Sequence, residues 1–517
     1  MGIPSYFKHV LDRYPQLLRR SARPADILCM DFNCLIYGCL KRPSLPPYTA
    51  AGRLEWERAL LSEITSYVIH VWKQAGQPKQ VVMAVDGVVP MAKIRQQRLR
   101  RFKSVWLAAK ERELGVRTGE SWDTNSITPG TEFMEALSRS LGALCKAKGD
   151  GWTVSDASEE GEGEQKIMKW IREKGPAALE GKHVAVYGLD ADLIVLCLLH
   201  ANKTPGTTWT ILRERQEFGG AAKAQEEFLS LDINGLSSVL FPGGSTQEIA
   251  DYMCGMSLLG NDFLPHSLGI HIREAGHDLL RDALRRGTRL TDVDATGRRS
   301  VCMQGLLEIL REWAVLEKES IQTAFKNKYR RKMYPRTPAE QAMMPVQNLP
   351  LVWAAEKDMW NRGTGLLDHA WREAYYSYRT PFTVTDADVR QRCLEWCKGL
   401  QWILDYYTGQ VPVDTEWMFA WSYAPLWMDL AVTVESLYTL PSVSSDARVP
   451  LKPQEQLALV LPVESWWLIR DRQLAGLPAK APVFWPTSFE FVSLGRRQLW
   501  ECEPAIPILT PGRLRCL

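Results

Sequence analysis

The sequence predicts an α/β protein with a mostly parallel central sheet flanked by helices, followed by an aromatic-rich, largely helical second region. Two observations carry this prediction. Within residues 1–290, short apolar runs that end in Asp alternate with helical patterns, at Ile27–Asp31, Gln80–Asp86 and His183–Asp190. Continuous apolar runs of this length suit parallel strands buried on both faces. Beyond residue 350 lie 12 of the 20 tryptophans, residues that most often pack in a core.

The composition is that of a folded globular chain. It has 517 residues, of which 45% are hydrophobic and 24% charged, and these values exclude wholesale disorder. The length allows two to four folding units at ~150 residues each. With 63 basic and 60 acidic residues the formal charge is only +3. Any binding of a polyanion must therefore come from local segregation of charge.

The charge and proline patterns divide the chain into three predicted parts. Residues 1–290 carry the strand and helix patterns. A basic, proline-containing stretch between Gln322 and Leu351 predicts a connector or insertion over residues 291–350, rather than a core element. Residues 351–517 form the aromatic-rich second region.

The sequence also favours an intracellular location. The longest strongly apolar run, Leu193–Leu199, is far shorter than the ~20 residues that span a bilayer, and the N-terminus has no apolar signal-peptide core. The eleven cysteines contain no CxxC pair, so neither a zinc knuckle nor a disulfide framework is supported. We expect a reduced protein without a membrane span, in the cytoplasm rather than the nucleus.

Acidic residues recur where the predicted strands end, the position at which open α/β sheets place their sites. Hard cations such as Mg²⁺ take carboxylate oxygens, and two ions ~3.5–4 Å apart can activate a water and stabilise the leaving oxygen of a phosphodiester. Like charges gathered in one cleft repel one another unless cations neutralise them, so such a cluster implies metal. The candidate catalytic and metal-binding residues are Asp31, Asp86, Glu162, Glu164, Asp190, Asp192 and Asp262.

Simpler interpretations of these acids stay open at this point. A single Asp at a strand end is more often a helix cap or a turn residue. The run Glu159–Glu164 alone is compatible with a solvated acidic loop. It is the recurrence of acids at several predicted strand ends that favours a metal site.

A basic helix is predicted directly after Asp86. In the segment Met91–Lys103, one helical face carries Lys93, Gln97, Arg100 and Arg101. Arginine offers paired hydrogen bonds to phosphate oxygens, lysine a point charge and glutamine a neutral donor, so this face suits a terminal phosphate. The alternative is a solvated basic helix, which the nearness of Asp86 makes less favoured.

Several segments, in matching order and spacing, resemble the XRN family of 5′→3′ exoribonucleases. The resemblance covers nearly the whole chain and rests on Met1–Pro4 with Arg13–Pro15, Met30–Asn33, Asp86–Lys93 through Gln96–Phe102, Trp122–Met134, Gly161–Glu164, Gly188–Leu193, Gly260–Pro265, Gly399–Trp402, Tyr406–Gly409, Trp417–Pro425 and Leu459–Pro462.

The resemblance implies a fold and a set of roles. It implies a core like that of PIN and flap nucleases, with residues 1–290 as the catalytic nuclease region and 351–517 completing the active-site pocket. It implies that the seven acids bind two Mg²⁺ ions, with Mn²⁺ as a substitute, and that Tyr37 and Trp417 sandwich the first base. It further implies that the 5′-monophosphate of RNA is held by Lys93, Gln97, Arg100 and Arg101.

The chain departs from the family pattern at a few positions. Cys34 replaces a glycine, Tyr37 and Gln165 each replace a histidine, and Glu160 replaces a proline. No acidic ligand or phosphate-binding residue is lost. The chain ends soon after the region that the family shares, so we expect a minimal form without the long C-terminal extension.

The resemblance implies a monomeric, processive exoribonuclease that hydrolyses 5′-monophosphorylated single-stranded RNA to nucleoside 5′-monophosphates, as in mRNA decay. One alternative is a structure-specific 5′ nuclease of flap-endonuclease type acting on DNA. A second alternative is a catalytically silent RNA-binding protein, which retention of all seven acids makes less favoured.

Overall fold

A computed structural model of the chain describes residues 2–20, 23–215, 227–330, 334–440 and 449–517. Met1 and part of the basic stretch predicted as a connector, residues 331–333, lie outside the described residues. No helix within the described ranges is long and apolar enough to cross a membrane.

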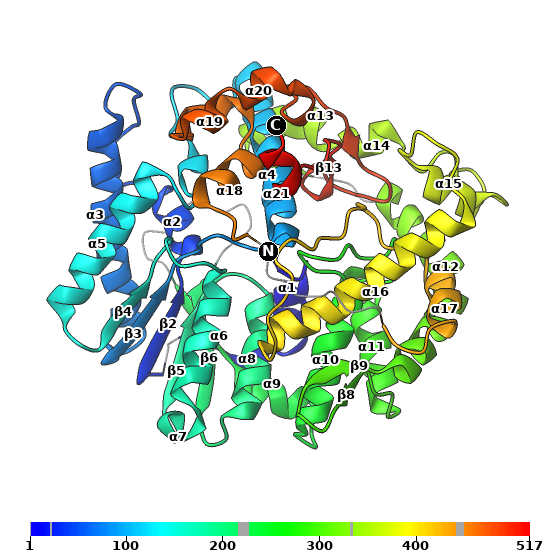
Figure 1. The fold of residues 1–517 in the computed structure, drawn as a ribbon, viewed down its shortest axis with the longest axis horizontal. Coiled ribbons are helices and arrows are strands. Elements are labelled where there is room, and N and C mark those ends of the chain that lie inside the picture. The colour runs from blue at the N-terminus through cyan, green and yellow to red at the C-terminus, as the bar shows by residue number, and fades with distance from the viewer. Residues whose placement is uncertain (1, 21–22, 216–226, 331–333, 441–448) are drawn as a thin grey trace.

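Within these ranges seven strands form the central sheet, in the order β1-β7-β6-β5-β2-β3-β4 (Figure 1). Strands β2 to β6 pair in parallel, whereas β7 pairs antiparallel with both β6 and β1. This confirms the predicted mostly parallel sheet. The strands are β1 (Leu18–Arg19), β2 (Ile27–Asp31), β3 (Gln80–Ala84), β4 (Trp152–Ser155), β5 (His183–Tyr187), β6 (Thr208–Glu214) and β7 (Phe228–Asp232).

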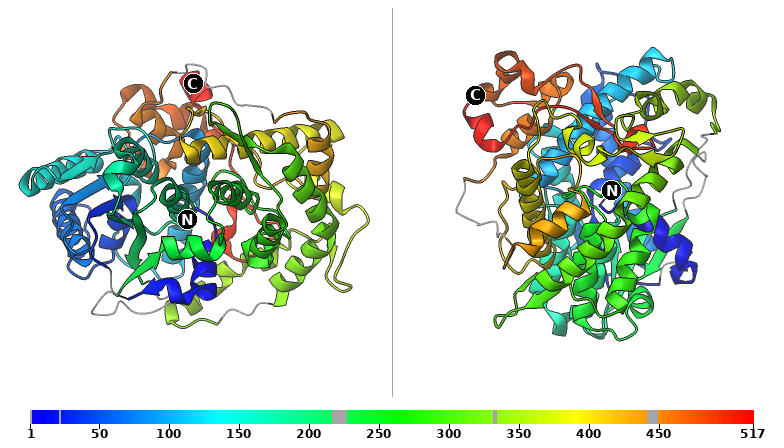
Figure 2. Two further views of the ribbon diagram at one scale, coloured as in Figure 1. Left: turned by 90° about the horizontal axis from the view of Figure 1, so that it is seen from below. Right: turned by 90° about the vertical axis from the view of Figure 1, so that its right-hand side faces the viewer.

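Helices cover both faces of the sheet, because successive residues of each buried strand point to opposite sides. Leu28 and Met30 pack with α3 and α5 on one face, and Ile27 and Cys29 pack with α6, α8 and α10 on the other. Figure 2 shows helices on both sides of the sheet. The helices of this region are α1 (Tyr6–Arg13), α2 (Asn33–Cys39), α3 (Arg53–Gln74), α4 (Met91–Glu113), α5 (Glu132–Lys148), α6 (Gly163–Lys174), α7 (Pro176–Leu179), α8 (Asp192–Lys203), α9 (Ile233–Leu240), α10 (Thr246–Leu258) and α11 (Gly276–Arg285).

The second region is largely helical, as predicted, and packs against the first. A single hydrophobic core includes side chains of α8 and α10 together with those of the second region, so packing is continuous across residues 290 and 350. The helices are α12 (Met303–Arg330), α13 (Pro338–Gln347), α14 (Leu349–Trp353), α15 (Trp371–Ser377), α16 (Asp386–Thr408), α17 (Trp427–Glu435), α18 (Pro453–Val460), α19 (Arg472–Ala475), α20 (Leu477–Lys480) and α21 (Pro511–Arg515).

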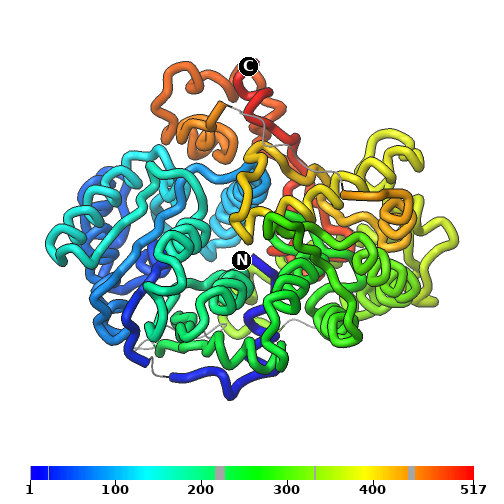
Figure 3. The backbone as a smooth tube through the Cα atoms, turned by 60° about the horizontal axis from the view of Figure 1, so that its bottom comes forward, coloured from blue at the N-terminus to red at the C-terminus, as the bar shows by residue number. Residues whose placement is uncertain are grey.

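Two further features position the site. Short antiparallel pairs lie outside the main sheet: β8 (Thr291–Val293) with β9 (Arg299–Val301), β10 (Trp360–Asn361) with β11 (Leu366–Leu367), and β12 (Phe491–Val492) with β13 (Glu503–Pro504). The C-terminal segment packs on α4, where Ile94 and Phe102 share a hydrophobic cluster with Leu457–Leu461 (Figure 3). The C-terminal segment therefore helps to hold the basic helix α4.

The predicted connector differs from the structure. Much of it belongs to α12, a 28-residue helix whose Ile321 and Phe325 are buried in the core. Lys328, which contributed to the basic pattern, is fully buried and pairs with Glu356 at 3.0 Å. The basic run is therefore part of a core helix. The run alone does not indicate this, because the acidic partner of Lys328 lies outside it, in a loop.

The Lys328–Glu356 pair yields a stability prediction. The two side chains are 0% and 1% exposed, so Lys328→Met leaves a buried carboxylate without its cation. We expect the free energy of unfolding in urea to fall by about 3–5 kcal/mol. Arg311→Met on the same helix is the control, since the Arg311–Glu435 pair is exposed and its loss should cost less than about 1 kcal/mol. Equal losses in the two variants would contradict the prediction.

Candidate active site

The acids at the strand ends meet at one edge of the sheet. Asp31 is the last residue of β2, and its Cα pairs with that of Ala84 at the end of β3, two residues before Asp86. Strand β5 flanks β2 on the other side, and Asp190 follows it. Because these three strands are parallel, their carboxyl ends bring the acids together.

Asn33 fixes the orientation of Asp86. Its amide nitrogen donates to Oδ2 of Asp86 at 3.0 Å, and its Oδ1 accepts from the Asp86 backbone N–H at 3.1 Å. The other oxygen of Asp86 accepts from the backbone N–H of Gly163 at 2.7 Å. The Asp86 carboxylate is thus held from both sides.

Gly163 allows α6 to approach the strand ends. Glu162 is the N-cap of this helix and Glu164 lies in its first turn, and both are buried. A Cβ atom at residue 163 would lie 2.7 Å from Oδ1 of Asp31 and 2.8 Å from the carbonyl oxygen of Ala84. The close approach therefore requires glycine between the two glutamates.

Lys93 of α4 lies among the acids. Its Nζ is 2.5 Å from Oε2 of Glu162 and 2.9 Å from Oδ2 of Asp262, which follows α10. Burial lowers the pKa of Lys93, but Asp262 and Glu162 outweigh it, so the pKa lies well above its ordinary value. The ammonium group is charged and serves as counter-charge to two carboxylates.

All seven predicted acids belong to one electrostatic cluster, in which they act on one another and on Lys93. Burial is the main cause that raises carboxylate pKa values there, and neighbouring negative charges add to it for Asp31, Glu164 and Asp192. Within the described ranges no three His, Cys, Asp or Glu side chains are grouped closely enough to hold one ion. Lys93 pairs directly with two of the seven acids, and the side chains of Lys166 and Arg100 also act on the charges of the cluster.

The second region contributes aromatic side chains to the cluster. Tyr406 of α16 donates its hydroxyl to Oε1 of Glu162 at 2.7 Å. Its ring stacks on Trp402 at 4.9 Å, and Trp402 packs at 5.2 Å against Trp417, which is 7% exposed. Trp417 also packs closely against Gly399, where a Cβ would lie 2.6 Å from the indole ring. Trp417 is therefore fixed relative to the acids through a row of rings.

The predicted phosphate-binding face of α4 is split between buried and exposed positions. Gln97 and Arg101 are buried, whereas Arg100 is exposed. Arg101 donates from Nη1 to Thr128 Oγ1 at 2.5 Å and to Asn125 Oδ1 at 3.2 Å, and burial lowers its pKa to about 10. The Oε1 atom of Gln97 and the Nε atom of Arg101 have no hydrogen-bond partner among the described residues. Both side chains keep unused polar atoms beside the acid cluster.

Tyr37 lies on α2 and is 39% exposed. It is near enough to Arg101 to act on the charge of that guanidinium. A stacking role for Tyr37 and Trp417 with a base between them stays a prediction.

Several contributors were not predicted as site residues. Asn33, Asn125 and Tyr406 lie in segments that carried the family resemblance, but no local pattern gives their partners. Gly2 is another: a Cβ there would lie 2.4 Å from the Asp192 carboxylate, so the start of the chain passes directly beside the cluster. Their roles depend on contacts between distant segments, which a spacing pattern does not report.

Comparisons with known proteins agree with this geometry. Residues 1–215 match the family model described as "XRN 5'-3' exonuclease N-terminus", and residues 354–515 match the model described as "Xrn1 helical domain". The chain belongs to the XRN family. These two matches contain the acids at the strand ends and the aromatic row of the second region, except Asp262, which lies between them.

Curated XRN relatives are distant and longer. The 5'-3' exoribonuclease 1 of Homo sapiens is 27% identical, over 99% of this chain and 34% of the relative. The protein of the same name from Saccharomyces cerevisiae is 25% identical, over 99% of this chain and 43% of the relative. The 5'-3' exoribonuclease 2 of Saccharomyces cerevisiae is 30% identical, over 54% of this chain and 35% of the relative. The chain thus spans less than half the length of these relatives.

Two departures from the XRN pattern lie beside the acids. The Cys34 thiol donates to the backbone carbonyl oxygen of Asp31 at 3.2 Å. Gln165 follows Glu164 on α6, and its Nε2 has no hydrogen-bond partner among the described residues. Neither departure removes a carboxylate from the cluster.

Asp192 yields a prediction for pH-dependent stability. Burial and Asp190 raise its pKa from 3.8 to about 7, so the folded protein holds a proton that the unfolded chain releases near pH 4. This stabilising contribution is complete below pH 4 and is lost as the pH rises to 7, by at most about 4 kcal/mol. In EDTA, we expect Asp192→Asn to raise the free energy of unfolding at pH 8 by about 1–4 kcal/mol, and much less near pH 4.

Urea unfolding between pH 4 and 8 measures this effect. Asp12→Asn, at an exposed position on α1, is the control and should show no gain that grows with pH. A destabilisation by Asp192→Asn that is equal at pH 5 and pH 8 would rule out relief of charge repulsion as the cause.

Proposed function

We propose that this protein is a metal-dependent 5′→3′ exoribonuclease that hydrolyses 5′-monophosphorylated single-stranded RNA to nucleoside 5′-monophosphates. One observation carries the proposal. Seven acids from separate elements, four of them buried and three partly buried, converge beside a helix that presents Lys93, Gln97 and Arg101 within three turns. This combination provides a site for cations next to a site for a phosphate. Membership of the XRN family supports the same conclusion.

Two Mg²⁺ ions, or Mn²⁺ in their place, are the proposed cofactors. The donor set fits a hard cation, because it consists of carboxylates, and burial and mutual repulsion raise the pKa values of Asp31 and Glu164 among them. Such ions would supply an activated water and would stabilise the leaving oxygen of the phosphodiester. The chain's own contribution is orientation: Asn33 and Gly163 hold Asp86, and Tyr406 holds Glu162. The ligands would be Asp31, Asp86, Glu162, Glu164, Asp190, Asp192 and Asp262.

The proposed 5′-phosphate site lies on α4 and consists of Lys93, Gln97, Arg100 and Arg101. Arg101 is pre-oriented by Asn125 and Thr128, so it loses little conformational entropy when it binds an anion. Lys93 lies one helical turn before Gln97 and already compensates two carboxylates, which couples the phosphate site to the acids. A buried site of this kind favours a monophosphate over a capped or triphosphorylated end. Tyr37 and Trp417 are the proposed base-stacking pair.

Two alternatives are less well supported. A flap-type nuclease acting on DNA would not account for the aromatic row that Tyr406, Trp402 and Trp417 extend from the acid cluster. A silent RNA-binding protein has no need for a cluster of seven carboxylates, of which the four buried ones cost stability. All eleven cysteines are free thiols, which supports the proposal of a reducing, intracellular environment. We further propose that the enzyme acts as a monomer in the cytoplasm.

Removal of one acid tests the catalytic assignment. With Mg²⁺ and 5′-monophosphorylated RNA, Asp262→Asn should lower the cleavage rate by at least about 10²–10³-fold, because it removes a carboxylate that would hold a cation where negative charge develops. RNA binding should persist. Asp282→Asn, at an exposed position on α11, is the control. A wild-type cleavage rate in Asp262→Asn would remove this residue from the catalytic set.

The phosphate site is tested by end preference. We expect wild-type protein with Mg²⁺ to degrade 5′-monophosphorylated RNA faster than 5′-triphosphorylated or 5′-hydroxyl RNA, as measured by product size. Arg101→Gln should lower the preference for 5′-phosphate over 5′-hydroxyl by about 10- to 100-fold, since it removes a charge-assisted contact. Arg112→Gln, exposed near the end of the same helix, should leave the preference unchanged. An unchanged preference in Arg101→Gln would exclude the proposed pocket.

A further inference from the structure

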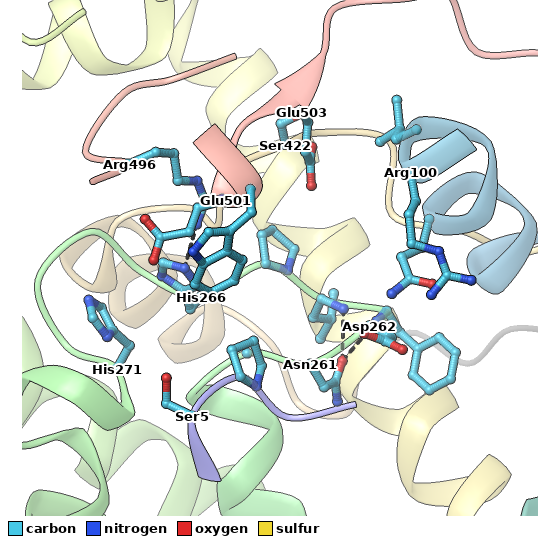
Figure 4. Close-up of a pocket in the computed structure, with 18 of the residues that line it drawn as sticks. Ser5, Arg100, Asn261, Asp262, His266, His271, Ser422, Arg496, Glu501 and Glu503 are labelled. Carbon is cyan, nitrogen blue, oxygen red and sulfur yellow. Dashed lines mark hydrogen bonds between the residues drawn. The ribbon is translucent and has the colours of Figure 1, made fainter. Parts of the chain in front are cut away.

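A cavity lies on another face of α4 and begins at the proposed active site. We call it the side cavity and define it by Arg100, Asp262, Leu99, Ser422, Arg496 and Trp500, which are among its lining residues. Arg100 and Asp262 also belong to the predicted site, and they lie near each other in Figure 4. Arg496 and Glu501 lie on the opposite side of the view. The side cavity therefore extends from the acid cluster toward the C-terminal segment.

The lining of the side cavity is predominantly basic. It includes six arginine and lysine side chains and three carboxylates. Two of these carboxylates are already compensated, Asp262 by Lys93 and Glu501 by Arg273. The third, Glu503, lies 3.9 Å from Arg95. The remaining positive charge of the lining favours an anion. Arg100 is the first cation of the side cavity on the way from the acid cluster.

Arg496 is a buried cation that faces the side cavity, and the carboxylates of Glu503 and Glu501 act on its charge without forming an ion pair with it. It is 8% exposed, and none of the ion pairs among the described residues involves it. It donates from Nη1 to Nε2 of His266, whose pKa burial lowers to about 3. His266 is neutral and donates from Nδ1 to the Ser267 carbonyl at 2.7 Å, so it supplies no negative charge. The Nε atom of Arg496 has no hydrogen-bond partner among the described residues.

The other groups in the side cavity match a nucleoside. Gln96 and Asn261 line it, and the buried Oε1 of Gln96 and Nδ2 of Asn261, an acceptor and a donor, have no hydrogen-bond partner in the described ranges. Trp500, in the 3₁₀ turn η6 (Leu499–Glu501), is 44% exposed, and the Arg273 guanidinium lies 5.0 Å from its ring centroid. An exposed aromatic ring beside cations suits a base attached to a phosphate.

We propose that the side cavity binds the nucleoside 5′-monophosphate product and is the path by which it leaves. This inference rests on the proposed function. When a strand is degraded from its 5′ end, the rest of the RNA occupies the entrance, so the released nucleotide needs a separate path. The product phosphate passes from Arg100 toward Arg496, and the base moves toward Trp500. No covalent step is involved.

The first test fills the side cavity. Ser422→Trp places a bulky ring in its wall. With 5′-monophosphorylated RNA and rapid chemical quenching, cleavage of the first nucleotide should stay within twofold of wild type, since quenching detects cleavage before release. The steady-state rate should fall by tenfold or more, and 3′-labelled RNA shortened by one nucleotide should accumulate. Ser238→Trp, at an exposed position on α9, is the size-matched control.

The second test measures affinity for the product. Added AMP should inhibit wild-type degradation, and Arg496→Gln should weaken that inhibition by about tenfold while the KM for 5′-monophosphorylated RNA stays within twofold. Trp500→Leu, at a half-exposed position, gives the same test if Arg496→Gln does not fold. In contrast, Arg101→Gln should raise the KM for RNA.

The outcomes separate the two proposals. If wild-type protein degrades no RNA, the proposed function fails and the side-cavity proposal falls with it. If wild-type protein degrades RNA but Ser422→Trp retains the full steady-state rate, the exit path is wrong and the function stands. If Arg496→Gln and Trp500→Leu are inhibited by AMP as strongly as wild type, the side cavity is not the product site.

Discussion

Repulsion among buried carboxylates is the constraint on which the rest of this structure depends. Seven acids are brought to one edge of a sheet, where burial raises the pKa of several of them. The Lys93 ammonium compensates only Glu162 and Asp262 directly. The fold must therefore hold a group of charges that would separate if the surrounding elements were free to move. Hydrogen bonds from Asn33 and Tyr406 supply part of that restraint.

The restraint acts largely through α4, because this helix contacts the acids, the predicted phosphate site and the side cavity. Arg98 on α4 is buried and donates to the carbonyl oxygens of Leu459 and Phe484. Lys103 donates to the carbonyl oxygens of Trp500 and Cys502 at 2.6 and 2.8 Å. These bonds tie a helix of the first region to the C-terminal segment. The C-terminal segment thus holds α4 in place, although the acids that α4 contacts belong to the N-terminal region.

The sequence predicts local features well and distant contacts poorly. Strands β2, β3 and β5 lie where apolar runs predict them, because a buried parallel strand is marked by its own residues. The seven acids follow from those strand ends and from the family resemblance. Tyr406 could not be predicted as the partner of Glu162, because 244 positions separate them. Likewise, Lys328 belongs to a basic run in sequence, yet Glu356 makes it a buried core residue of α12.

The net charge of +3 conceals a local segregation of charge, in which seven acids lie beside the basic side chains of α4. A protein that binds RNA along its length needs many exposed cations, because its affinity comes from the counterions that each phosphate releases. Here Lys93 and Arg101 are buried and lie within three turns of one helix beside the acids. Under the proposed function, affinity is concentrated at the 5′ end of the RNA. Each cleavage then creates another end of the same kind, so one contact provides both the selection of the end and the repetition of the reaction.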